Sequence, residues 1–169
     1  MRNRKLYLDM DGVLADFERG VLELAGMEPT PLNGKRDAGY DDRMWTAIQK
    51  VEHFYGKLLP MPGAQEMFHT LWKRYGERCE ILTGIPKPRR NILYAREDKL
   101  NWVNNVLSPD IVVNVVLRED KPGYCTGSDC VLIDDSIRNI RAWEKAGGTG
   151  ILFVDVKTAL SQLDHIEAR

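Results

Sequence analysis

The sequence predicts an α/β protein in which a five-stranded, mainly parallel sheet is covered by helices on both faces. Three observations support this. Five short apolar runs read as strands, and segments with helical spacing alternate with them along the chain. The apolar runs are nearly continuous rather than alternating, which is typical of strands buried on both faces. The chain has 169 residues, of which 43% are hydrophobic and 29% charged, as expected for one globular domain.

Each expected element rests on a local pattern. The strands are the runs KLYL, CEIL, IVVNVVL, VLI and GILFV, at 5–8, 79–82, 111–117, 131–133 and 150–154. Strong helix formers or helical spacing predict helices at 63–75, 96–107, 136–146 and 157–167. Pro62 stands where helices commonly begin. Strands and helices in this order predict a Rossmann-like three-layer sandwich.

The first connection breaks this rhythm, because about seventy residues separate the first two strands while such connections are normally short. Within this gap, 17–26 and 42–54 read as helices, joined by a stretch that contains PTPLNG. We therefore expect a small helical cap inserted after the first strand. The expected division is a core made of 1–16 and 61–169, with the cap at 17–60.

Composition argues against several classes of function. The formal net charge is −1, so no global field attracts a nucleic acid polymer or an anionic membrane. No apolar run is long enough for a membrane span, and the basic N-terminus lacks the apolar core of a signal peptide. Three cysteines without metal-like spacing suggest reduced thiols and a cytoplasmic location. A homodimer is possible, but no self-complementary apolar stripe in the sequence indicates one.

Polar side chains follow four of the expected strands. Ligands of open parallel sheets bind outside the carboxyl ends of the strands, so these side chains are expected to converge on one edge. They are Asp9 and Asp11 after the first strand, Thr83 and Gly84 after the second, Lys121 after the third, and Asp134 and Asp135 after the fourth.

This combination suits the handling of phosphate. Asp9 and Asp11 alternate along an extended backbone, so both carboxylates reach the same side. Four clustered carboxylates require a cation, and Mg²⁺ is the default for oxygen ligands beside phosphate. Thr83 and Lys121 can hold the charged oxygens of a phosphoryl group. One aspartate can then attack phosphorus, and a second can donate and accept a proton.

The motifs resemble those of the haloacid dehalogenase (HAD) superfamily of phosphatases. DMDGVLADF resembles its first motif, ILTG carries the threonine of the second, REDK the lysine of the third, and VLIDDS the acidic fourth motif. All four stand in the order typical of the superfamily. A finer resemblance, carried by HFYGKLLPMPGA, ILTGIPKPR and KLNWV as well, is to the 5'(3')-deoxyribonucleotidase branch.

The resemblance implies a role for each site residue. Asp9 would be the nucleophile and Asp11 the general acid and base. Asp9, the backbone carbonyl of Asp11, and Asp135 would bind Mg²⁺, with Asp134 close by. Thr83 and Lys121 would grip the phosphate with help from Lys99, and Phe17 would pack on a nucleobase. The implied substrate is a small phosphate ester, a deoxynucleoside or ribonucleoside monophosphate.

The sequence departs from that branch in two places. Gly84-Ile85-Pro86 follows the motif-two threonine where the better-known members have Ser-Pro, so a side-chain contact to phosphate would be either missing or replaced by a backbone N–H. The insert is also shorter. Both departures concern the substrate and leave the expected phosphotransfer chemistry unaffected.

Other interpretations remain open at this stage. Thr83 or Asp134 could cap a helix. Lys99 and Lys121 could be solvated surface lysines. Phe17 could be an ordinary core residue. A superfamily phosphatase of another ester, such as a sugar phosphate, is the first functional alternative. The second is a non-enzymatic phospho-accepting receiver module, although its acidic pair comes first in the chain and its phospho-acceptor in the middle.

Overall fold

A computed structural model describes residues 3–169, so residues 1 and 2 of the expected core segment 1–16 lie outside the described residues. The sheet has five strands in the order β3-β2-β1-β4-β5, and every neighbouring pair is parallel. The strands are β1 (Lys5–Leu8), β2 (Cys79–Gly84), β3 (Val113–Val116), β4 (Cys130–Asp134) and β5 (Thr149–Leu152). The predicted α/β sandwich is confirmed, with a sheet that is wholly parallel.

Helices connect the strands and build the insert. The α-helices are α1 (Phe17–Glu23), α2 (Tyr40–Gln49), α3 (Ala64–Tyr75), α4 (Ala95–Val106), α5 (Ile137–Lys145) and α6 (Val156–Glu167). Short 3-10 turns are η1 (Tyr55–Lys57), η2 (Gly76–Arg78), η3 (Pro88–Arg90) and η4 (Arg118–Tyr124). Several of the α-helices begin at a residue whose side chain caps them. At the start of α6, for example, Asp155 accepts a hydrogen bond of 2.8 Å from the Thr158 backbone N–H.

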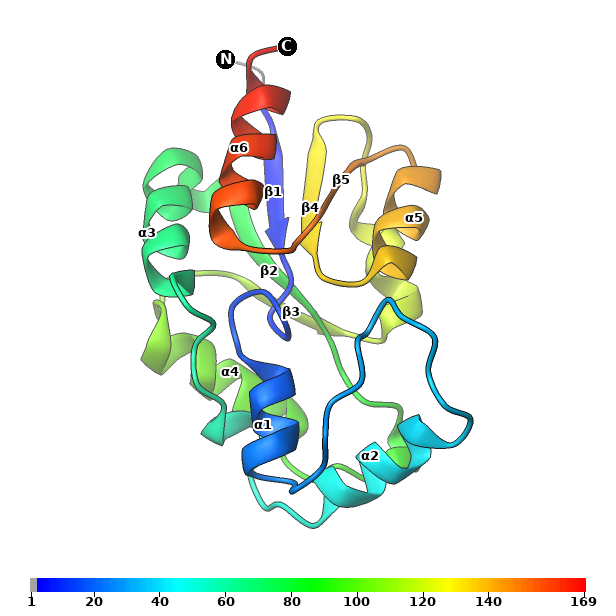
Figure 1. The fold of residues 1–169 in the computed structure, drawn as a ribbon. Helices are drawn as coiled ribbons and strands as arrows, with labels where there is room; N and C mark the ends of the chain where they lie inside the picture. Colours follow the sequence, from blue (N-terminus) through cyan, green and yellow to red (C-terminus); the bar gives the residue numbers. More distant parts are fainter. Residues whose placement is uncertain (1–2) are drawn as a thin grey trace.

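The two faces of the sheet bury separate sets of side chains, because successive residues of a strand point to opposite faces. Leu6 and Leu8 of β1 belong to a large hydrophobic cluster with residues of α3, α4 and α6. Tyr7, between them, belongs to a second cluster with Ile140 and Trp143 of α5. Figure 1 shows α3 and α6 on one side of the strands and α5 on the other. The central strand is thus shielded from both sides.

The insert shares the large cluster with the sheet and does not build a core of its own. Val21 of α1 and Met44 and Ile48 of α2 pack into the cluster that also holds Leu8. The second insert helix differs from the predicted 42–54: it begins two residues earlier, at Tyr40, and ends at Gln49, after which residues 50–54 form turns.

The third and fifth strands are also shorter than predicted, the fifth being Thr149–Leu152 where 150–154 was expected. Residues 111–117 were expected to pair, but β3 spans only Val113–Val116. The Val112 side chain is 53% exposed just before the strand, so an apolar run here exceeds the paired segment. Within residues 3–169, no helix combines the length and the apolar character that a membrane crossing requires.

Candidate active site

The sheet topology gathers the expected site residues at one edge. β1 lies between β2 and β4, with Leu8 level with Ile81 on one side and with Ile133 on the other. Asp9 therefore leaves the sheet beside the ends of both neighbours. Thr83 and Gly84 are the last two residues of β2 and Asp134 the last residue of β4, rather than the first residues after these strands.

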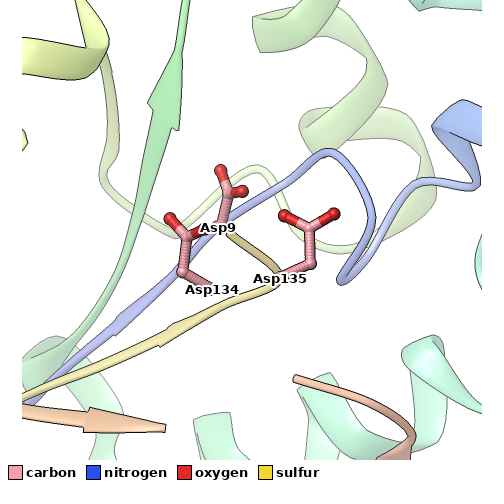
Figure 2. A group of neighbouring side chains, drawn as sticks. All are labelled: Asp9, Asp134 and Asp135. Carbon is pink, nitrogen blue, oxygen red and sulfur yellow. The ribbon is translucent and has the colours of Figure 1, made fainter. Parts of the chain in front are cut away.

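Three carboxylates form one cluster at this edge. An oxygen of each of Asp9, Asp134 and Asp135 lies within 4.8 Å of the others. Figure 2 shows them at the ends of β1 and β4, with their carboxylates pointing the same way. Burial, and then the charge of Asp134, raise the pKa of Asp9 to about 7. Burial, followed by the charges of Asp9 and Asp134, raises the pKa of Asp135 well above its usual range.

Asp134 has both of its carboxylate oxygens engaged. Oδ1 accepts from the Ser136 backbone N–H at 2.8 Å, and Oδ2 accepts from the Lys121 ammonium at 2.7 Å. The side-chain amide of Asn139 donates to both oxygens, at 3.1 and 3.0 Å. The expectation that Asp134 caps α5 was wrong: Ser136 is the N-cap, and its hydroxyl accepts from the Asn139 backbone N–H.

Lys121 is part of the cluster and not a solvated surface lysine. Its side chain is buried, and its Nζ atom donates to Asp9 at 3.0 Å as well as to Asp134. Burial alone would lower the pKa of Lys121, but the charges of Asp9 and Asp134 outweigh burial and raise the pKa above its ordinary value. One buried ammonium therefore faces three buried or half-buried carboxylates.

A second lysine holds Asp11 and Thr83. Lys99 of α4 has no exposed surface, so the alternative that placed it on the surface was wrong. Its Nζ atom donates to Asp11 Oδ2 at 2.5 Å and to Thr83 Oγ1 at 3.0 Å. The ring centroid of Tyr55 lies 4.2 Å from the same ammonium. Thr83 is fully buried inside β2 and caps no helix.

The Asp11 side chain lies outside the three-carboxylate cluster, although the sequence grouped it with them as a metal ligand. Because Oδ2 is taken by Lys99, Oδ1 is left buried without a hydrogen-bond partner among residues 3–169. The next residue, Gly12, has φ of +79°, and a Cβ there would collide with the Asp135 carboxylate. Glycine is thus required both for the turn and for the approach of Asp135.

The expected substrate residues Phe17 and Gly84 differ in their surroundings. Phe17 is half-buried at the start of α1, and its ring centroid lies 5.6 Å from that of Phe54 and 6.2 Å from that of Trp45. Phe54 and Tyr55 are buried, so they belong to the core. A Cβ at Gly84 would meet no atom within 4 Å, so the space beside its backbone is open.

Two asparagines of the site were missed by sequence reasoning. Asn139 holds Asp134 from α5, five positions further along the chain. Asn33, in the PTPLNG stretch of the insert, bonds the backbone on both sides of Ser136. The first could have been found by helical spacing after VLIDDS. No local pattern could have found the second, since it acts across more than a hundred positions.

The residues present fit a hard divalent cation. Asp9 and Asp135 offer carboxylate oxygens from within 4.8 Å of each other, and Lys121 alone does not neutralise the cluster. Oxygen donors with excess negative charge are the set that Mg²⁺ prefers.

Curated relatives support the resemblance seen in the motifs. The chain is 28% identical over 150 residues to the human mitochondrial 5'(3')-deoxyribonucleotidase, a match that covers 79% of this chain and 63% of that protein. It is 27% identical over 134 residues to a putative 5'(3')-deoxyribonucleotidase of Vibrio phage KVP40, covering 79% and 67%. The chain thus spans a little under two thirds of the human relative.

A solved structure supports the fold. A HAD-superfamily hydrolase from Ehrlichia chaffeensis superposes with a TM-score of 0.50 and 13% identity, covering 99% of each chain. No protein-family model matches the sequence.

Proposed function

We propose that this chain is a Mg²⁺-dependent phosphomonoester hydrolase that works through an aspartyl-phosphate on Asp9. The observation that carries the proposal is the convergence of Asp9, Asp135, Lys121 and the Lys99–Asp11 pair on the carboxyl edge of the sheet. The resemblance to deoxyribonucleotidases supports the same chemistry.

In the first step, an oxygen of the Asp9 carboxylate attacks phosphorus and the bond to the ester oxygen breaks. Asp11 gives its proton to that leaving oxygen. Asp11 Oδ1 is the atom suited to this work, because Lys99 occupies Oδ2 and leaves Oδ1 without a partner in the described part of the chain. The alcohol leaves, and Asp9 carries the phosphoryl group.

In the second step, water attacks phosphorus and the bond to Asp9 breaks. Asp11 takes the proton of the water, which restores both carboxyl groups and releases inorganic phosphate. Lys121 and the Thr83 hydroxyl stabilise the charge on the phosphoryl oxygens, and the Thr83 hydroxyl can donate because its oxygen already accepts from Lys99. The Gly84 backbone N–H supplies a further donor beside open space.

Asp9, Asp135 and the backbone carbonyl of Asp11 would hold Mg²⁺. Asp134 is better suited to orient Lys121, because both of its oxygens already accept hydrogen bonds. When bound, Mg²⁺ neutralises charge on the carboxylates and on the phosphoryl oxygens.

For the substrate we propose a (deoxy)nucleoside monophosphate in the cytoplasm, bound under a helical cap of residues 17–60 that sits on the core of 1–16 and 61–169. Phe17 would pack against the base, since a flat base stacks well on an aromatic ring that is only half-buried. The free state of Cys79, Cys125 and Cys130 agrees with a reducing compartment. A sugar phosphate remains the alternative substrate.

The decisive experiment measures phosphate release from a panel of esters, with Mg²⁺ and with a chelator. The panel contains deoxynucleoside and ribonucleoside 5'- and 3'-monophosphates, sugar phosphates and an aryl phosphate. We expect Mg²⁺-dependent release that favours the nucleotides, and a loss of more than about a thousand-fold in Asp9→Asn with an unchanged circular dichroism spectrum.

Three results would change the proposal. Release from sugar phosphates alone would keep the chemistry and replace the substrate. Full activity in Asp9→Asn would rule out the covalent step. Activity that survives the chelator would rule out the metal.

A further inference from the structure

We propose that Asn33 of the insert is a positioning residue that sets the affinity of the metal site by holding the backbone of Asp135. Its side-chain Nδ2 donates to the Asp135 carbonyl at 2.6 Å, and its Oδ1 accepts from the Ile137 backbone N–H at 2.8 Å. One amide side chain therefore bonds the backbone on both sides of Ser136. The proposal rests on the proposed function only through the assignment of Mg²⁺ to Asp135.

Asp135 needs such support because, in the part of the chain that the structure describes, its carboxylate lacks the hydrogen bonds that orient Asp9 and Asp134. Asp9 is held by the Met10 backbone N–H and by Lys121, and Asp134 by four hydrogen bonds. Within residues 3–169, by contrast, no hydrogen bond reaches the Asp135 carboxylate, although it completes the cluster. Its position is set by its backbone and by the empty side of Gly12 against which it rests.

The turn that carries Asp135 is also incomplete without Asn33. Ile137 is the first residue of α5, and the N–H groups of a first helical turn have no partner within the helix. Among residues 3–169, the Ser136 hydroxyl accepts only from the Asn139 backbone N–H. Asn33 supplies the partner for Ile137 and, through its other atom, fixes the peptide that precedes Ser136.

Asn33 can reach this turn because of the shape of its loop. The loop between α1 and α2 makes a turn in which the Gly34 backbone N–H donates to the Pro31 carbonyl at 3.2 Å, with Asn33 at the tip. In Figure 1 this loop rises from the insert toward the near end of α5. The insert, which forms the proposed cap, thus also contributes a residue that supports the metal site.

The test measures binding of Mn²⁺, used as a paramagnetic probe for the Mg²⁺ site, by electron paramagnetic resonance on the whole chain without substrate. We expect Asn33→Ala to bind Mn²⁺ about ten-fold more weakly than wild type, as is usual when a supporting contact of a metal ligand is lost. Asn104→Ala, at an exposed position of α4, is the matched control and should bind as wild type.

A second variant separates the hydrogen bond from electrostatics. Asn33→Asp can still accept from Ile137 but cannot donate to the Asp135 carbonyl. Its added negative charge alone would strengthen cation binding, so weaker binding in this variant as well supports the lost hydrogen bond as the cause.

Two results would overturn the proposal, and they are distinguishable. If wild type binds Mn²⁺ and Asn33→Ala binds it equally well, Asn33 only anchors the loop, and the proposed function stands. If wild type binds no Mn²⁺, the metal assignment itself fails, and the role of Asn33 falls with it.

Discussion

At the scale of single residues, the site depends on two lysines that are buried almost completely. Lys121 sits between Asp9 and Asp134, and Lys99 sits between Asp11 and Thr83. A buried ammonium is stable only where carboxylates compensate its charge, so each lysine and its partners form a unit.

The Lys99–Asp11 unit gives a stability prediction. Lys99→Met should lower the free energy of unfolding by about 3 kcal/mol, because the Asp11 carboxylate is left beside a buried apolar group. Adding Asp11→Asn should restore at least about 1 kcal/mol of that loss, because no uncompensated charge remains. Urea unfolding of the two single variants and the double variant measures this, and strictly additive losses would contradict the coupling.

Asp11→Asn also tests the proton transfer. Because an amide can neither release nor accept the required proton, phosphate release should fall by about a hundred- to ten-thousand-fold. Turnover of the most reactive aryl phosphate, whose leaving group needs least protonation, should fall least. An equal loss for aryl and alkyl esters would show that Asp11 does not protonate the leaving oxygen.

The place of a site residue can be predicted from the sequence where the residue belongs to a recognisable motif. The motifs place Asp9, Thr83, Lys121 and Asp135 at one edge, and the structure brings them there. The burial of Lys99 is not predictable, because a lysine on a helix gives no local sign that a ring such as Tyr55 will cover it.

At the scale of elements, the turn after β1 is as important as the strand itself. Gly12 has a left-handed backbone, and the Asp135 carboxylate occupies the space that a side chain would fill. Gly26, after α1, has a similar φ of +66°, but a Cβ there would meet no atom within 4 Å. A substitution at Gly26 therefore introduces backbone strain alone, whereas the same substitution at Gly12 adds a collision with Asp135.

Gly12→Ala should accordingly be worse than Gly26→Ala. We expect Gly26→Ala to lose about 1 kcal/mol of unfolding free energy from strain alone. Gly12→Ala should lose about 3 kcal/mol, because the methyl group also displaces Asp135. Urea unfolding compares the stabilities, and Mn²⁺ binding should weaken only in Gly12→Ala. Equal effects of the two substitutions would argue against the close approach of Asp135.

The insert is joined to α4 by an ion pair that depends on pH. His53, between α2 and η1, lies 2.8 Å from the buried Asp98 carboxylate, and its ring stacks on Tyr94. The hydrogen bond to Asp98 raises the pKa of His53 above its ordinary value of 6.5. A raised pKa in the folded state means that this contribution is fully present below the unfolded pKa and is lost as the pH rises through the folded pKa.

His53→Gln should therefore lower stability more at about pH 5.5 than at about pH 8.5. The measurement is the urea midpoint of wild type and variant at both pH values. His69→Gln is the control, because His69 on α3 makes no ion pair in the part of the chain that the structure describes. A difference that does not depend on pH would rule out the charged pair.

The boundaries of the elements show how far local patterns reach. Most expected helices begin and end within one or two residues of the observed ones, since their caps and apolar spacing are local. The expected helix at 42–54 ran past the observed end at Gln49, because residues 50–54 form turns although no glycine or proline among them marks that end. The expectation that Asp134 caps α5 failed because Lys121 and Asn139 engage the Asp134 carboxylate, while the Ser136 hydroxyl caps the helix.

At the scale of the whole molecule, the sheet edge concentrates negative charge that folding must bury. A divalent cation that binds the folded chain relieves this repulsion and shifts the equilibrium toward the folded state. Adding Mg²⁺ at about ten times its dissociation constant should stabilise the protein by about 1.4 kcal/mol. We expect a matching rise in melting temperature by differential scanning calorimetry. The rise should be absent in Asp135→Ala, and an equal rise in that variant would contradict the assignment of the metal site.

The strand order has a consequence for how the chain acquires its structure. β1, which leads into Asp9, is made first but lies in the centre of the sheet, so its two edges are paired by β2 and by β4. During synthesis, one edge must wait for Cys79–Gly84 and the other for Cys130–Asp134. Pairings between segments so far apart are slow to form and leave an apolar strand open to wrong partners. Because β1 needs both β2 and β4 as partners, at least one of its edges remains unpaired until most of the chain has been synthesised.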